Sequence, residues 1–248
     1  MQDITLQNPF MQLSYAAVST CVDILGDTLL AFYLHGSALH GDAIVGVSDL
    51  DCCLIVAHAL DNRQTAALID TERSLQARYP VASEVHLTVY TIDALQQDSF
   101  ARFLLRHNAA ILYGKNVVDI LEAQGYITPR PDAQLAKSRL PFARDCFRDA
   151  CIGKQPACTG KLPDNPYLQT RKFARYFVVL EGAYWLMTQG IFTTFDKTTV
   201  LRDLKKHLPE FCDVFTQTER ILQNPLQTTM PPKQFLSHIR PFVKHIFS

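Results

Sequence analysis

The sequence predicts a mixed α/β domain, a mixed sheet with helices, over residues 1–125, followed by an all-helical bundle over residues 126–248. Three observations lead to this fold class. Up to Gly125, short apolar runs alternate with segments in which apolar residues recur at helical spacing. After the proline-containing connection YITPRPD, patterns typical of strands are largely absent. The charge also changes sign, because residues 1–125 hold 14 acidic and 6 basic side chains and residues 126–248 hold 10 and 18.

The first domain is expected to place helices against a sheet. Its predicted strands are short apolar or alternating runs bounded by polar residues or glycine, and they cover residues 29–36, 49–57, 84–91 and 109–114. Its predicted helices cover residues 13–25, 61–79 and 93–107. Their lengths, and the spacing of apolar residues or a capping residue at the start, are typical of helices. Asp93 is the expected N-cap of the last of these helices, and Ser37 is expected to begin a further helix after the first strand.

The second domain reads as a bundle of helices joined by short connections. The predicted helices cover residues 132–152, 167–189, 199–207 and 211–222, with a final one after Pro232. A loop rich in glycine, proline and asparagine separates the first two, over residues 153–166.

Composition excludes several classes of protein. The N-terminal residues MQDITLQNPF lack the basic start and apolar core of a signal peptide. The most apolar stretch, FVVLEGAYWLM, contains Glu181 and is too short to cross a bilayer. Seven cysteines without a CxxC pair indicate reduced thiols rather than disulfides or a zinc site. We therefore expect a cytoplasmic protein that does not bind membranes.

One segment carries the chemistry. A strand ends at Gly36-Ser37, eleven residues follow, and the next strand begins with Asp49-Leu50-Asp51. Since alternate residues of a strand share a face, Asp49 and Asp51 project together, and their repulsion of roughly 4 kcal/mol calls for a cation such as Mg²⁺. Gly36 lacks a Cβ, so the backbone there can approach a phosphate, and Ser37 would present helix N–H groups to it.

This pattern resembles the signature of the nucleotidyltransferases related to DNA polymerase β, in which a strand, Gly-Ser, a spacer of similar length and Asp-x-Asp follow one another. Members carry a third carboxylate on a neighbouring strand, and Glu84 in SEVHLTVYT is the candidate. The resemblance implies that Asp49, Asp51 and Glu84 hold one or two Mg²⁺ ions, which would clamp the attacking and leaving oxygens.

Within that superfamily the chain is most similar to the aminoglycoside (streptomycin/spectinomycin) adenylyltransferases, which also carry a C-terminal helical domain. Their Val-Glu-Val-Thr-Ile-Val-Val strand resembles residues 83–89, which implies Glu84 as general base. Their bundle lysine corresponds to Lys197, which would contact the triphosphate, and Arg175 is the candidate for their arginine.

The resemblance implies transfer of a nucleoside monophosphate, AMP from ATP or another NTP, to a hydroxyl with release of pyrophosphate. The expected partners are the nucleotide and a small-molecule or protein acceptor that the sequence leaves open. Absence of a long basic patch with interleaved aromatic residues, together with zero net charge, argues against extended nucleic-acid binding.

Other interpretations of these residues remain open. The aspartate pair could be a solvated turn, and His86, on the strand face of Glu84, could line the site. Arg202 and His207 match the Arg-x4-His pattern of HEPN-type helical ribonucleases, some of which pair with minimal nucleotidyltransferases. A catalytically silent nucleotide-binding regulator is the third alternative.

Overall fold

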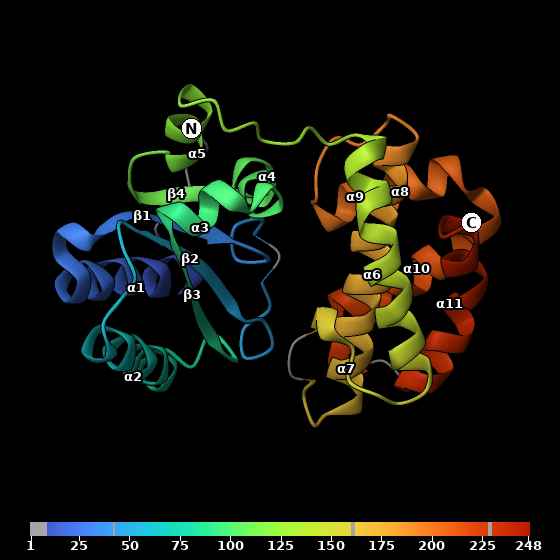
Figure 1. The fold of residues 1–248 in the computed structure, drawn as a ribbon. Helices are drawn as coiled ribbons and strands as arrows, with labels where there is room; N and C mark the ends of the chain where they lie inside the picture. The colour runs from blue at the N-terminus through green and yellow to red at the C-terminus, as the bar shows by residue number, and fades with distance from the viewer. Residues whose placement is uncertain (1–8, 42, 160–161, 228–229) are drawn as a thin grey trace. The chain divides into compact units, whose positions relative to one another are not determined.

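The computed structural model describes residues 9–41, 43–159, 162–227 and 230–248. The chain divides into two compact units, one ending at Pro129 and the other beginning at Arg130 (Figure 1). The division falls in the proline-containing connection, a few residues after the position at which the sequence predicts a domain boundary. Each unit is described by itself.

The first unit is built on a four-stranded sheet of order β3-β2-β1-β4. Its strands are β1 (Leu29–His35), β2 (Leu50–Val56), β3 (Val85–Thr91) and β4 (Ala109–Gly114). Strands β2 and β3 run parallel, whereas β1 pairs antiparallel with both β2 and β4. The predicted strands are therefore all present, and the order makes β2 and β3 neighbours.

Helices cover both faces of this sheet, as Figure 1 shows. On one face lie α1 (Pro9–Leu25) and α2 (Asn62–Arg78), which share an apolar core with the sheet. On the other lie α3 (Ile92–Gln97), α4 (Ser99–Asn108) and α5 (Val117–Ala123), over a second core. A short 3-10 turn, Gly26–Thr28, joins α1 to β1. The mixed α/β architecture predicted from the sequence is confirmed.

The two faces of β2 are divided by the alternation of its side chains. Leu50 and Leu54 pack in the core with α1 and α2, whereas Cys53 and Ile55 pack in the core with α3 to α5. Asp51 shares the face of Cys53 and Ile55, because it is two and four residues away from them. It is only partly buried, at the beginning of the strand.

Three local predictions are wrong. The described residues after β1 form turns rather than a helix from Ser37, because Gly36 and Gly41 adopt positive φ angles of 74° and 72° that break helical continuity. Asp93 is not an N-cap: Thr91 caps α3 through the N–H of Ala94. Nor is the following helix continuous, since it breaks at residue 98 between α3 and α4.

All regular secondary structure in the described residues of the second unit is helical, as predicted. Its helices are α6 (Ala133–Cys151), α7 (Pro166–Phe173), a π-helical segment (Ala174–Leu180), α8 (Glu181–Thr188), α9 (Lys197–His207), α10 (Cys212–Gln223) and α11 (Pro232–Ile246). Short 3-10 turns lie at Ala157–Thr159, Pro209–Phe211 and Pro225–Gln227. Buried phenylalanines, among them Phe177, Phe215 and Phe242, fill the core of the bundle. In the described parts of both units, none of the helices combines the length and the apolar character that crossing a membrane requires.

Candidate functional site

The two aspartates are held by the first residues of β2. Leu50 lies between them with a side chain that is fully buried, so Asp49 and Asp51 must point away from the core that Leu50 enters. The N–H of Leu50 donates to the carbonyl oxygen of Glu84 over 2.9 Å, which begins the parallel pairing of β2 with β3. The position of the acid pair is therefore set by the sheet itself.

The loop before Asp49 is fixed by its own hydrogen bonds. The Ser48 hydroxyl accepts from the N–H of Ile44 at 2.9 Å, and the carbonyl oxygen of Ser48 accepts from the N–H of Ser83 at 2.9 Å. Nearer the middle of the loop, the N–H of Gly46 donates to the carbonyl oxygen of Val81 at 2.8 Å. These bonds attach the loop to the segment that leads into β3, so the approach to both strands is a single ordered corner.

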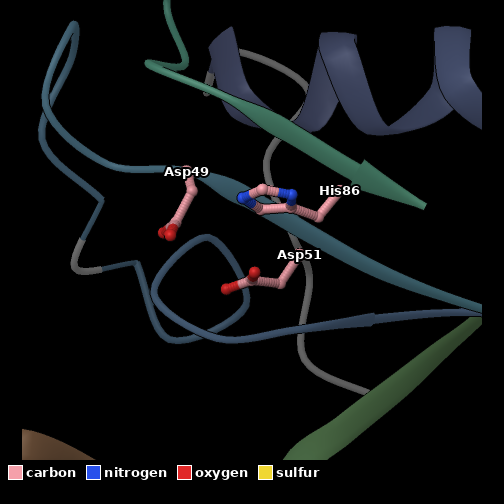
Figure 2. Close-up of side chains that lie close together, drawn as sticks. All are labelled: Asp49, Asp51 and His86. Atoms are coloured by element: carbon pink, nitrogen blue, oxygen red, sulfur yellow. The ribbon is translucent and has the colours of Figure 1, made fainter. Parts of the chain in front are cut away.

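His86 joins the two aspartates. It is the register partner of Asp51 across the parallel β2–β3 pair, and the two side chains share one face of the sheet. One ligand atom from each of Asp49, Asp51 and His86 can be chosen so that all three lie within 4.8 Å of one another. In Figure 2 the imidazole and the two carboxylates face one another. A carboxylate pair beside an imidazole is a set of donors that suits a divalent cation.

Glu84, predicted as the third ligand, lies beside this group rather than in it. Its Oε2 is 3.2 Å from Nε2 of His86, and both side chains are 48% exposed. The structure therefore places Glu84 against the imidazole and His86 against the aspartates. His86 holds the place at which the sequence predicts a carboxylate.

The predicted phosphate-binding turn lies beside the acid pair. His35, the last residue of β1, is the register partner of Asp51 on the side opposite to His86, and Gly36 and Ser37 follow it directly. Ser37 is 7% exposed, and its hydroxyl forms no hydrogen bond with any group in the described ranges of the chain. A buried hydroxyl without a partner costs about 1–3 kcal/mol, which a bound acceptor such as phosphate would offset.

The predicted phosphate contacts in the bundle belong to the second unit. Lys197 is the first residue of α9, directly after the N-cap Asp196, whose carboxylate accepts from the N–H of Thr199 at 2.8 Å. Arg175 lies in the π-helical segment, and both cationic side chains are half-buried. Their contact with a triphosphate stays a prediction.

The ribonuclease-like pair, Arg202 and His207, lies on α9. Arg202 and His207 are five residues apart, which separates them by about 140° around a straight helix. The Arg202 Nε also donates to Asp203 at 3.1 Å. The Arg-x4-His interpretation stays a prediction.

The sequence predicts Glu84 as the third residue of the site, whereas the structure places His86 beside the two aspartates. The alternation along this strand could have identified His86 as a candidate, because Val85 and Leu87 are buried on one face and His86 and Glu84 share the other. Which of these two residues lies level with Asp51 is decided only by the register of the strand against β2. That register depends on the bond between Leu50 and Glu84, which no local pattern specifies.

Comparison with known proteins supports the fold. No family model matches the chain, and no curated protein sequence matches it. Among solved structures, spectinomycin adenyltransferase AAD(9) from Enterococcus faecialis, solved with ATP and spectinomycin, matches with a TM-score of 0.56 at 12% identity. The match covers 94% of this chain and 98% of that one, so it includes sequence from both units. A toxin-antitoxin structure with AMP-PNP matches 52% of this chain and 95% of that one, at 16% identity and a TM-score of 0.35.

Proposed function

We propose that this chain is a nucleotidyltransferase, which transfers a nucleoside monophosphate, AMP from ATP, to a hydroxyl group of an acceptor and releases pyrophosphate. One observation carries the proposal: Asp49 directly before β2 and Asp51 within it lie beside His86 and next to the Gly36-Ser37 turn that follows β1. The fold that holds these residues is shared with an adenyltransferase that was solved with ATP.

The acidic pair would hold a divalent cation, which neutralises the charge of a triphosphate and activates its α-phosphorus when bound. Asp49 and Asp51 suit this role because they share a strand face and an ordered loop precedes them. The role of Gly36 and Ser37 would be to contact phosphate oxygens, through a backbone without a Cβ and a hydroxyl that has no hydrogen-bond partner among the described residues.

Glu84 is the proposed general base. Its carboxylate lies outside the group of three possible ligands and is about half exposed, so a substrate hydroxyl could reach it. In the reaction, the acceptor oxygen attacks the α-phosphorus, its proton passes to Glu84, and the bond to the bridging oxygen of pyrophosphate breaks. Catalysis by the chain would consist mainly of positioning and charge stabilisation, as in phosphoryl transfer generally.

The acceptor is the open part of the proposal. A small molecule or a protein hydroxyl fits the reaction, and spectinomycin is a substance solved with the neighbour, not with this chain. We therefore propose the reaction class and leave the acceptor to a screen.

The test begins with the four NTPs, each with Mg²⁺ or Mn²⁺, in a thermal-shift assay. Pyrophosphate release is then measured with a cell extract as the source of acceptor, and mass spectrometry identifies the nucleotidylated product. We expect ATP with a divalent ion to raise the melting temperature and to yield an adenylylated product. Absence of stabilisation by every NTP would overturn the proposal in favour of a silent fold.

The assignment of residues is tested with Asp49→Asn and Asp51→Asn, each of which should abolish product formation while the circular dichroism spectrum is unchanged. Asp70→Asn is the matched control, because Asp70 is an exposed acid on α2 whose partner is Arg73. Wild-type activity in either active-site variant would contradict the assignment. His207→Ala should leave nucleotidyl transfer intact.

A further inference from the structure

The imidazole of His86 lies beside Asp49 and Asp51, where the sequence predicts the carboxylate of Glu84 as the third ligand. We propose that His86 is a metal ligand, and that it gives the site a preference for a first-row transition-metal ion such as Mn²⁺ over Mg²⁺. The inference rests on the proposed function in one respect, which is that Asp49 and Asp51 form its cation site.

The first argument is geometric. Ligand atoms lie about 2.2 Å from a bound ion of this kind, so two of them on one ion are at most about 4.4 Å apart. The donor atoms of Asp49, Asp51 and His86 already lie within 4.8 Å of one another. Small rotations of the three side chains are therefore enough to bring them to one ion, without any movement of the sheet.

The second argument concerns how firmly the imidazole is held there. The parallel register places His86 level with Asp51, and the bond from the Leu50 N–H to the Glu84 carbonyl begins that register. The carboxylate of Glu84 lies 3.2 Å from Nε2 of the same ring. The backbone register thus keeps His86 beside Asp51, and one neighbouring side chain contacts its ring.

The third argument is chemical. Mg²⁺ binds oxygen ligands and retains several waters, whereas imidazole nitrogen is a ligand of the later divalent metals. A site with two carboxylates and one imidazole therefore loses affinity for Mg²⁺ relative to a site with three carboxylates. It gains relative affinity for Mn²⁺, Co²⁺ or Zn²⁺ in the order that these metals follow in nitrogen-containing sites.

The experiment uses Mn²⁺ and Mg²⁺ as probes, on the full chain without nucleotide. Free Mn²⁺ is followed by electron paramagnetic resonance, Mg²⁺ by competition, and pulsed spectra show whether an imidazole nitrogen binds the Mn²⁺ directly. In the wild type we expect a nitrogen coupling, and we expect His86→Ala to lose it and to bind Mn²⁺ at least about 10-fold more weakly. In His86→Glu the ratio of Mn²⁺ to Mg²⁺ affinity should fall at least about 10-fold, because all three donors are then oxygens.

Two histidine controls separate this site from others on the same sheet. His58→Ala removes an exposed imidazole after the far end of β2, and it should change neither the coupling nor the affinity ratio. His35→Ala removes the imidazole on the other side of Asp51. If the coupling disappears in His35→Ala and persists in His86→Ala, the wrong histidine has been assigned and the proposal is overturned.

The outcomes also separate this proposal from the proposed function. A nitrogen coupling that depends on His86 supports the metal assignment even if no NTP is turned over. The assignment of His86 as a metal ligand is overturned if nucleotidyl transfer occurs without any nitrogen coupling. It is also overturned if the ratio of Mn²⁺ to Mg²⁺ affinity is the same in the wild type and in His86→Glu. Either result leaves the proposed function intact. Since His86 is about half exposed, these variants should fold, and His86→Gln provides a second neutral replacement if one does not.

Discussion

The hydroxyl of Ser48 accepts a hydrogen bond from the N–H of Ile44 over 2.9 Å, one residue before the first aspartate of the site. The N–H of Ser48 in turn donates to the carbonyl oxygen of Ile44, also at 2.9 Å, so the two residues close a small ring of bonds. Ser48 is completely buried. The orientation of Asp49 therefore depends on a polar residue that would not itself touch a substrate.

Ser48→Ala should destabilise the protein and weaken the site together. Removal of the hydroxyl leaves the N–H of Ile44 without that acceptor, which costs about 1–3 kcal/mol in urea unfolding. A looser loop should also lower the affinity for Mn²⁺, measured by titration of the folded variant. Ser74→Ala on the exposed face of α2 is the control, with an expected change within about 0.5 kcal/mol. A stable Ser48→Ala protein with unchanged Mn²⁺ affinity would contradict the role of this bond.

Leu50→Ala should cost about 2–5 kcal/mol in unfolding free energy, because the side chain is fully buried in the core with α1 and α2 and its removal leaves a cavity. The adjacent carboxylates should lose their fixed separation, so product formation should fall in the protein that remains folded. Leu50→Met retains the volume, and a loss below about 1.5 kcal/mol is expected. Equal losses in the two variants would show that packing at this position does not depend on side-chain volume.

The strands and the acid pair were predictable because their patterns are local. Alternation identifies β3 over seven residues, and the Asp-Leu-Asp run identifies the beginning of β2 without knowledge of its neighbours. The caps were less predictable, since Asp93 and Thr91 both have side chains that can accept from a backbone N–H. Thr91 caps α3 in the structure.

The partner of the acid pair was not predictable in the same way. Glu84 and His86 share a strand face, and a shift of two residues in the register of β3 against β2 would bring Glu84 level with Asp51 in place of His86. That register is set by pairing between segments more than thirty residues apart, which begins with the Leu50–Glu84 bond. The alternation of a strand predicts which face of the sheet a residue occupies. Which residue of the neighbouring strand it lies beside depends on the register, and the register is known only from the assembled sheet.

Glu72→Ala should weaken the attachment of α2 to β3, which is the last strand in the sheet order. The Glu72 Oε1 accepts from the backbone N–H of Leu87 at 2.7 Å, and Gln76 on the same helix donates to the carbonyl oxygen of Ser83. We expect a loss of about 1–3 kcal/mol, and greater self-association by light scattering, because the strand edge is uncovered. Glu72→Gln keeps an acceptor and should retain most of the stability. A similar loss in both variants would mean that the carboxylate charge, not the bond, is what matters.

The second unit contains a buried acid that makes its stability depend on pH. Glu181 is 8% exposed, and its Oε2 forms no hydrogen bond within the described part of the chain. Burial raises the pKa of the Glu181 carboxyl from its ordinary value of 4.5 to about 8, against the opposing effect of the nearby Arg139 guanidinium. Between these two pH values the folded state holds a proton that the unfolded state has released.

The unfolding free energy of this unit should therefore fall as pH rises from about 4.5 to about 8, by an amount on the order of 5 kcal/mol. The sign follows because the folded state binds the extra proton, so raising pH favours the unfolded state. Trp185, the single tryptophan and four residues along α8, reports this unit in urea titrations from pH 5 to pH 9. Glu181→Gln should remove most of the pH dependence because the amide cannot ionise, whereas Glu210→Gln, at an exposed position, should keep it. Identical pH profiles for the wild type and Glu181→Gln would show that the buried carboxyl does not titrate in this range.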